Sequence, residues 1–307
     1  MENLRGAALM TLAMLGFAVE DMFVKLLAGV FPTWQIIGIL GMGGGIVFGA
    51  LTLLRREVLF PRAALSPTVL VRNLGELIGT VGFVTAIALT PLSSASAILQ
   101  ATPLAVTLGA ALFFREPVGW RRWSAILAGF FGVLMIIRPG MDAFDPLSLF
   151  AVIAVVGLAV RDLATRNVPR ATSSFQLSFL AFMTLIPAAT LLSIFSPSGF
   201  VMPAASHWGL ILGAVVMGVA SYYAIVAAMR IGEVSFVTPF RYSRLIFALV
   251  IGMLVFRETP DLTMLTGAAI IVGSGIYTLW RERKLRQGRQ RSLSLGASQG
   301  YEAPKSI

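Results

Sequence analysis

The sequence predicts an all-α membrane protein in which ten transmembrane helices form two inverted five-helix repeats. Three observations support this prediction: long apolar segments, positive charge concentrated in alternate loops, and a motif that recurs in the second half of the chain. Of the 307 residues, 57% are hydrophobic and only 12% are charged, whereas soluble domains carry roughly 25% charged residues. The mean hydropathy of +0.86 is likewise too high for a water-soluble protein.

The apolar segments have the length of membrane spans. Because the hydrocarbon region offers the backbone no water to bond, segments of about 20 apolar residues are expected to be helices. Charge or proline, as in Glu116-Pro117 and Arg138-Pro139, ends each segment, and the short loops leave no room for an inserted soluble domain. The predicted spans are 4–27, 33–54, 68–89, 93–114, 120–137, 146–165, 173–195, 207–229, 235–256 and 262–280.

The loop charges predict the orientation, because cytoplasmic loops carry an excess of Lys and Arg. With the N-terminus in the cytoplasm, the outer loops hold only Arg138 and Arg257. The inner segments then hold Arg5, Arg55, Arg56, Arg62, Arg115, Arg121, Arg122, Arg166, Arg170, Arg230 and a cluster that begins at Arg281. We therefore expect a multi-pass protein of the bacterial inner membrane with both termini in the cytoplasm.

The net charge of +10 has the same explanation. It lies in the inner loops and in residues 282–307, which are predicted to form a basic, disordered cytoplasmic tail. Positive charge at these positions faces the anionic inner leaflet. The expected partners are therefore the lipid bilayer and a small-molecule substrate, and no nucleic acid is expected. No feature of the sequence specifies an oligomeric state.

Two halves of the chain, residues 1–139 and 140–281, resemble each other at an offset of about 141–142 residues. The segment from Asp21 to Lys25 matches the segment from Asp162 to Arg166, and Phe-Arg-Glu occurs at both 114–116 and 256–258. Five spans per half is an odd number, so the halves cross the membrane in opposite senses. Inverted repeats are typical of secondary transporters that bind substrate near the midplane. The alternative is an old duplication with no role in transport.

Charges inside a span are costly, at least about 2.5–3.5 kcal/mol each, and so need partners or a wet cavity. Glu76 lies well inside the third predicted span, and Arg241 and Arg244 share one face of the ninth. We expect at least one of these three to contact substrate or a coupling proton, since an Arg facing a cavity can bind a polar planar substrate. Alternatively, Glu76 neutralises one of the two arginines in a structural ion pair.

Two further pairs of charges lie near span ends. Asp21 and Lys25 are four residues apart on one helix face, so they can pair with each other near the outer end of the first span. Arg161 and Asp162 lie near the inner end of the sixth span, at the inverted position. This symmetry predicts an outer and an inner gate, and the alternative is charge anchoring at the membrane interface.

Polar and aromatic residues within the spans are further candidates for substrate contacts. Gln100, Tyr222 and Tyr242 lie in the fourth, eighth and ninth predicted spans. An aromatic ring with a few polar groups suits a flavin or purine ring, although such residues in helical bundles often bond only a neighbouring helix. Pro103 and Pro239 could kink the same two spans and act as hinges.

With these residues in view, the chain resembles the drug/metabolite transporter superfamily, in its branch with two EamA-type repeats. The resemblance covers about residues 5–280 and is carried by the paired Phe-Arg-Glu turns, the glycine-rich helices that follow them, and the five-plus-five layout. The segments 239–244 and 256–261 look most like a proteobacterial group linked to riboflavin or S-adenosylmethionine uptake. The resemblance implies ten helices, both termini inside, and a central cavity lined by the first four helices of each half.

Several functions are disfavoured. The chain has no cysteine and one histidine, His207, so neither a metal site nor a bound cofactor is expected. No G-x-x-x-x-G-K-[ST] motif is present, which disfavours ATP-driven transport by this chain alone. We expect a carrier with riboflavin as its cargo, and no enzyme. The alternatives are S-adenosylmethionine uptake, export of amino acids or drugs, a membrane-embedded enzyme, and a non-transporting membrane subunit.

Overall fold

The computed structural model describes residues 2–299 except 117–118, 142, 170–171 and 232–233. In this part of the chain all regular elements are helical, and ten helical segments are long and apolar enough to cross a membrane. The predicted fold class is therefore confirmed. The observed spans agree with the predicted ones to within a few residues, but two of them are interrupted near their middle.

The first half contains five spans. They are formed by α1 (Glu2–Ala28), α2 (Thr33–Leu54), α3 (Pro67–Leu89), α4 (Leu92–Leu99) with α5 (Thr102–Phe113), and α6 (Trp120–Ile137), with a short 3₁₀ turn, η1, at Arg62–Leu65. Local signals place the start of α3. The Ser66 hydroxyl accepts a bond from the Val69 amide, and Pro67 occupies the first turn, where its missing N–H costs nothing.

The second half repeats this order. Its spans are η2 (Pro146–Ser148) with α7 (Leu149–Thr165), α8 (Ser174–Phe195), η3 (Ala205–His207) with α9 (Trp208–Ile231), α10 (Val234–Val237) with η4 (Thr238–Tyr242) and α11 (Ser243–Val255), and α12 (Leu262–Gln299). A capping box formed by Ser173 and Gln176 begins α8. The η4 turn interrupts the ninth span, just as residues 100–101 interrupt the fourth.

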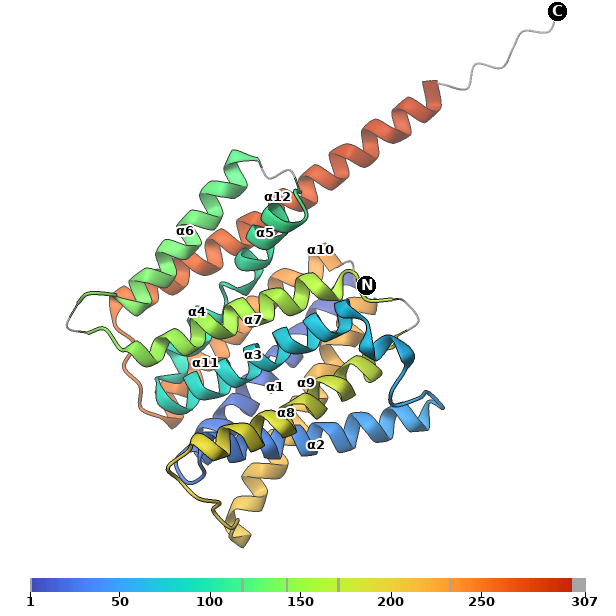
Figure 1. Cartoon of the computed structure of the whole chain (residues 1–307). Helices are drawn as coiled ribbons and strands as arrows, with labels where there is room; N and C mark the ends of the chain where they lie inside the picture. Colours follow the sequence, from blue (N-terminus) through green and yellow to red (C-terminus); the bar gives the residue numbers. More distant parts are fainter. Residues whose placement is uncertain (1, 117–118, 142, 170–171, 232–233, 300–307) are drawn as a thin grey trace, which may run out of the picture.

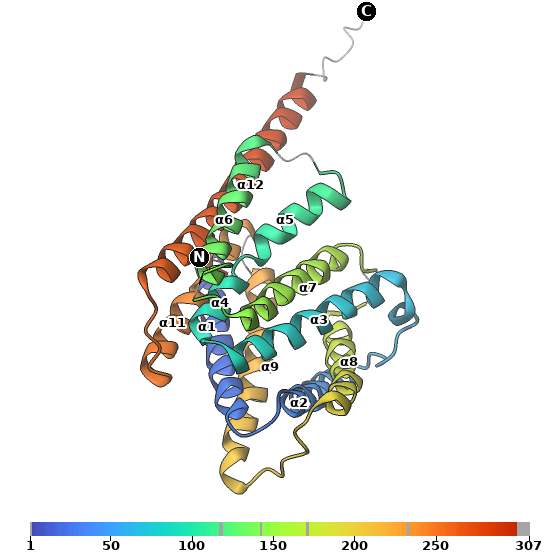
Figure 2. The ribbon, with the colours of Figure 1, turned by 60° about the vertical axis from the view of Figure 1, so that its left-hand side comes forward.

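The helices pack in pairs that join the two halves. The most extensive pairings are α3 with α7, α1 with α9, α2 with α8, and α6 with α12, and Figures 1 and 2 both show α3 beside α7 and α6 beside α12. In the repeat, α1 corresponds to α7 and α3 to α9. The α1–α9 pair therefore maps onto the α7–α3 pair, which is the arrangement expected of two inverted repeats around a pseudo-twofold axis.

Two ends of the bundle are distinguished below. The terminal end is the end at which α1 begins and from which α12 projects, and the opposite end carries the loops after α1, α6 and α11 (Figure 1). The α12 helix continues to Gln299, although a disordered tail was predicted from residue 282. Residues 300–307 of that tail lie outside the described residues.

The repeated Phe-Arg-Glu motif is a helix C-cap. Arg115 and Arg257 adopt the left-handed conformation, with φ of 51° and 54°, directly after α5 and α11. The amide of Glu258 then bonds back to the carbonyl of Gly252 at 2.9 Å, and Glu116 makes the corresponding bond. A left-handed residue just past a helix end is a common C-terminal signal, and here it turns the chain so that the Glu258 amide shares the Gly252 carbonyl with the Phe256 amide. The motif recurs because each half ends its fourth span with the same turn.

Glycines let α3 and α7 cross in backbone contact. A Cβ atom added to Gly157 would lie 2.4 Å from the amide nitrogen of Gly79 and 2.9 Å from the carbonyl oxygen of Gly75. Small residues four apart, as Gly75 and Gly79 are, permit this close approach in membranes. The crossing brings the residues that follow Gly75 and Gly157 on the two helices close to each other, and these residues line the site described next.

Candidate functional site

A cavity of about 510 Å³ lies in the middle of the bundle, between the two halves. It is lined by residues of α1, α2, α3, α4, α5, α7, α8, α9, η4 and α11, together with Leu279 of α12. The fifth span, α6, contributes no described residue to the lining. The cavity therefore has the walls that the family resemblance implies, and its volume falls in the range of about 300–1,000 Å³ typical of small-molecule sites.

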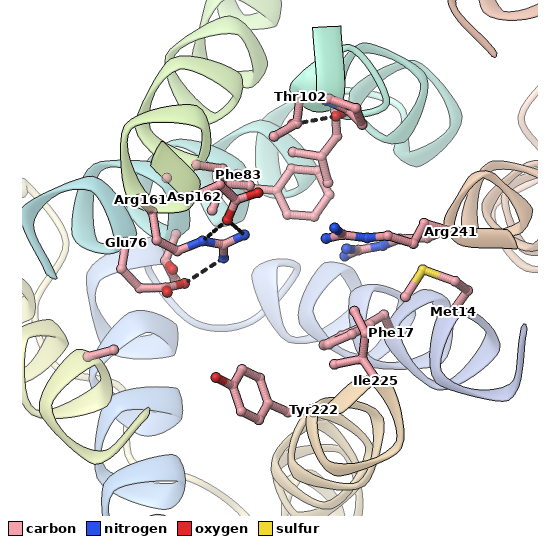
Figure 3. Close-up of a pocket in the computed structure, with 18 of the residues that line it drawn as sticks. Met14, Phe17, Glu76, Phe83, Thr102, Arg161, Asp162, Tyr222, Ile225 and Arg241 are labelled. Carbon is pink, nitrogen blue, oxygen red and sulfur yellow. Dashed lines mark hydrogen bonds and ion pairs between the residues drawn. The ribbon is translucent and has the colours of Figure 1, made fainter. Parts of the chain in front are cut away.

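One wall carries a cluster of paired charges. The Glu76 carboxylate is 3.2 Å from Nη1 of Arg161 and 3.0 Å from Nη2 of Arg72. The Arg161 guanidinium also bonds the Asp162 carboxylate, with Nε 2.8 Å from Oδ1. Figure 3 shows Glu76, Arg161 and Asp162 joined in this way on one side of the cavity. The alternative in which Glu76 neutralises Arg241 or Arg244 is thus wrong, because Glu76 pairs with Arg72 on its own helix and with Arg161 across the α3–α7 crossing.

Arg72 and Asp162 complete this wall, although anchoring at the membrane interface was the alternative for Asp162. The Arg72 side chain is only 5% exposed and bonds the Leu177 carbonyl at 3.0 Å as well as Glu76. Asp162 lines the cavity. Both residues therefore belong to the wall of the central cavity.

Arg244 is held in a buried ion pair. Its guanidinium forms a two-pronged bond to the Asp21 carboxylate, with Nη2 at 2.7 Å and Nε at 3.1 Å from Oδ2. The same guanidinium lies 5.1 Å from the ring centroids of both Phe17 and Phe83. The expected Asp21–Lys25 pair is therefore wrong, because Asp21 turns toward the second half of the chain and joins α1 to α11.

Arg241 differs from every other arginine in the lining. No hydrogen bond or ion pair joins its guanidinium to a residue in the described part of the chain. Figure 3 shows the Arg241 side chain reaching into the cavity from the wall facing Arg161 and Asp162, with Phe17 and Met14 beside it. An arginine offers five donors in a planar fork. The unpaired fork is therefore available to a ligand that accepts hydrogen bonds.

Gln100 lies where the two interrupted spans meet. Its side-chain amide donates to the backbone carbonyl of Tyr242 at 3.2 Å and lies 3.4 Å from that of Arg241. These carbonyls belong to η4, which comes directly before α11. The structure brings Gln100 and Arg241 together, as expected for candidate site residues. Gln100, however, bonds the backbone.

The two tyrosines have different surroundings. Figure 3 shows the Tyr222 hydroxyl pointing into the cavity, and its ring packs edge-on against Phe48, with centroids 5.2 Å apart. The Tyr242 hydroxyl is buried and lies against Gly275 of α12, where a Cβ atom would be 1.8 Å away. Tyr222 is thus the tyrosine whose polar group faces the cavity.

The two ends of the cavity differ in exposure. At the terminal end the lining includes Thr165 and Arg166, and the Arg166 side chain is 45% exposed. At the opposite end the last lining residues, Val24 and Ile87, are 2% and 1% exposed. The cavity therefore opens at the terminal end and is closed at the opposite end.

Lys25 lies in that closed end, outside the cavity lining. Its ammonium group is 3.7 Å from the carboxylate of Glu258 and donates to the carbonyls of Ile87 and Thr90. Phe17 and Phe83 line the cavity and Glu258 lies beyond its closed end, and sequence reasoning singled out none of the three. The signal for Glu258 was present, because the repeated Phe-Arg-Glu motif contains it.

Comparison with known proteins agrees with this architecture. The model of the EamA-like transporter family matches the chain twice, over residues 4–138 and 146–280. A crystal structure with 20% sequence identity aligns with a TM-score of 0.55 over 89% of this chain and 98% of that chain, so the two share a fold.

Three curated relatives are transporters. A riboflavin transporter of Vibrio cholerae is 33% identical over 200 residues, which cover 65% of this chain and 66% of that protein, just under two thirds of its length. An S-adenosylmethionine uptake transporter of Rickettsia felis is 24% identical over 73% of this chain and 75% of that protein. A pseudopaline exporter of Pseudomonas aeruginosa is 28% identical over 87% of this chain and 93% of that protein.

Proposed function

The chain belongs to the EamA-like transporter family, and on this premise we propose that it is a secondary carrier that takes up riboflavin across a bacterial inner membrane. The cargo crosses unmodified by alternating access, and both termini of the carrier lie in the cytoplasm. The observation that carries the proposal is the unpaired guanidinium of Arg241, in a cavity where the other lining arginines bond carboxylates.

An uncharged, flat cargo suits this charge arrangement. A cationic solute entering a low-dielectric cavity needs a carboxylate partner, and three of the four carboxylates in the lining, Asp21, Glu76 and Asp162, are already bonded to arginines. A flavin ring instead needs apolar and aromatic surface together with donors for its carbonyl groups. The Arg241 fork and the Tyr222 hydroxyl can supply those donors, and the relative in Vibrio cholerae supports the same cargo.

S-adenosylmethionine uptake is the second candidate. Its cargo carries a sulfonium cation, which would need a carboxylate. Glu20 lines the cavity, packs against Gly218, and makes no hydrogen bond to a described residue, so it could supply that carboxylate. The relatives from Rickettsia favour this reading, whereas the similarity to the pseudopaline exporter favours export of an amino-acid-like solute.

Growth of a riboflavin auxotroph tests the leading proposal. Cells that express the chain are expected to grow at limiting riboflavin, and cells that express Arg241→Ala at equal membrane abundance are expected not to. Unmodified flavin recovered from loaded cells would support transport without chemical conversion. If the wild-type protein reaches the membrane and does not rescue growth, the riboflavin assignment is wrong.

Purified protein in proteoliposomes separates the candidates. Labelled riboflavin and labelled S-adenosylmethionine are offered to the same vesicles, and uptake of the first alone is expected. Excess unlabelled riboflavin should block that uptake. Reporter fusions at both ends of the chain test the orientation, and a periplasmic reporter that is active at either end would contradict it.

A further inference from the structure

One ion pair lies at each end of the bundle, and the internal repeat relates the two pairs. At the opposite end, Lys25 Nζ is 3.7 Å from Oε1 of Glu258. At the terminal end, Arg166 Nη1 is 3.0 Å from Oε1 of Glu116. Lys25 and Arg166 are 141 positions apart, and Glu116 and Glu258 are 142 apart. Each pair therefore joins a helix of one half to the Phe-Arg-Glu turn of the other half.

The carboxylate of Glu258 makes several bonds in addition to this ion pair. It accepts bonds from the Leu92 amide at 2.6 Å, the Ser93 amide at 3.0 Å and the Ser93 hydroxyl at 2.6 Å. These groups begin α4, where the helix dipole favours a negative charge. One carboxylate thus ties the turn between α11 and α12 to the start of α4.

The ammonium group of Lys25 completes the same closure. It bonds the carbonyls of Thr90 at 2.6 Å and Ile87 at 3.2 Å, at the end of α3, where the dipole favours a positive charge. The side chains of Lys25 and Glu258 are only 17% and 10% exposed. Four segments from both halves therefore meet at one buried ion pair, and this junction closes the cavity.

The related pair at the terminal end is much more exposed to solvent. The side chains of Arg166 and Glu116 are 45% and 44% exposed, and Arg166 lies at the mouth of the cavity. No further side-chain bond of the Glu116 carboxylate to a described residue accompanies the ion pair. Equivalent residues thus hold one end shut and leave the other end open in the same molecule.

From this asymmetry we propose that Glu258 and Glu116 are a pair of reciprocal gate residues. The proposal rests on the proposed carrier function. Two inverted halves can exchange their conformations, and each carboxylate then takes the environment of the other. In the state open at the opposite end, Glu258 is exposed, and Glu116 becomes buried with Arg166. Neither residue touches the cargo, so both act by positioning the halves.

Single engineered cysteines can report the two states, because the natural chain has none. Ser94→Cys lies in a second pocket, at the opposite end beside Glu258. Val106→Cys lies in the central cavity on α5, on the terminal side of the break at residues 100–101. The reaction rate of each thiol with a charged maleimide is measured on the purified full chain in nanodiscs, without any substrate.

We expect Glu258→Gln to raise the Ser94→Cys rate and lower the Val106→Cys rate. The ratio of the first rate to the second should rise about tenfold, which corresponds to about 1.4 kcal/mol in the equilibrium between the two states. Glu116→Gln should move both rates the other way or leave them at the wild-type value, since the opposite end is already closed. As a matched control, Glu57→Gln removes a carboxylate that bonds Ser173 away from both gates, and should change neither rate.

Rates that move in the same direction in both gate variants, or that do not move in Glu258→Gln, would overturn the assignment. If Glu258→Gln does not fold, Ser93→Ala replaces it, because this change removes only the hydroxyl bond to Glu258, and smaller rate changes in the same two directions are expected. Wild-type rates in a folded Ser93→Ala protein would likewise refute the gate. Because no cargo is added, failure of the riboflavin proposal leaves this test unaffected.

Discussion

The side-chain amide of Gln100 donates a hydrogen bond to the backbone carbonyl of Tyr242 at 3.2 Å. The two residues are 142 positions apart, which is the offset of the Phe-Arg-Glu repeat, so they occupy equivalent places in the two halves. The bond therefore lies close to the pseudo-twofold axis and joins the two interrupted spans. We expect the halves to stay in contact in this region whichever end is open.

Gln100→Leu should weaken this contact. Losing one hydrogen bond costs about 0.5–1.5 kcal/mol, so we expect a lower melting temperature in detergent and reduced transport. The matched control is Thr190→Val, which removes a local bond to the Ile186 carbonyl on the exposed side of α8. If the two substitutions lower the melting temperature and transport equally, the Gln100 bond contributes no more than a local bond within one helix.

Arg241 and Arg244 should separate function from stability. Arg241→Ala removes no ion pair, so we expect normal folding with riboflavin affinity reduced about tenfold or more. Arg244→Ala leaves Asp21 buried without its partner, and breaking a buried pair in this way costs about 3–5 kcal/mol. Binding titrations and thermal melts of both variants check the difference. A destabilised Arg241→Ala with unchanged affinity would contradict it.

Gly157→Ala should force α3 and α7 apart, because the added methyl group would meet the backbone of Gly79. Overpacking of this kind costs about 1–3 kcal/mol, and it would also separate Glu76 from Arg161. We expect a lower melting temperature and lost transport. Gly273→Ala is the control, since a Cβ atom there meets nothing within 4 Å. A stable, active Gly157→Ala protein would disprove the backbone contact.

The loops at the opposite end predict a dependence on pH. Asp261 accepts hydrogen bonds from the Arg138 guanidinium and the Met264 amide. These bonds hold the pKa of Asp261 below its ordinary value, and the bond from Arg138 is the larger cause. A carboxyl with a lowered pKa stabilises the folded state above its ordinary pKa of about 3.9, and this stabilisation is lost as the pH falls through the lowered value.

The melting temperature of the wild type should therefore exceed that of Asp261→Asn by a constant amount between about pH 5 and 7, and the difference should shrink below about pH 4. The Asp261 side chain is 52% exposed, so the effect is small, about 0–1 kcal/mol. In an Arg138→Gln background the same substitution should show little pH dependence. A difference in melting temperature between the wild type and Asp261→Asn that grows as the pH falls would contradict this prediction.

Sequence reasoning was sufficient for the ten helices and for the family. The length of an apolar segment is almost enough to predict a membrane-spanning helix, because backbone groups in lipid must be hydrogen-bonded within the protein and a helix does this within one segment. The odd number of spans per half then requires the inversion. Even the interrupted spans had a local signal, since Pro239 lies within η4 and Pro103 follows the break at residues 100–101.

The partners of the charged residues depended on the tertiary structure. Helical spacing alone favoured Asp21 with Lys25, yet Asp21 bonds Arg244, which is 223 residues away, and Lys25 bonds Glu258. Periodicity places a side chain on a face of its own helix, but not opposite a particular neighbour. Which helices cross, and how closely, is decided by contacts such as that of Gly157 with Gly79. For this reason only the folded chain distinguishes Arg241, which has no ion pair with any residue that the structure describes, from Arg244, which is bonded to Asp21.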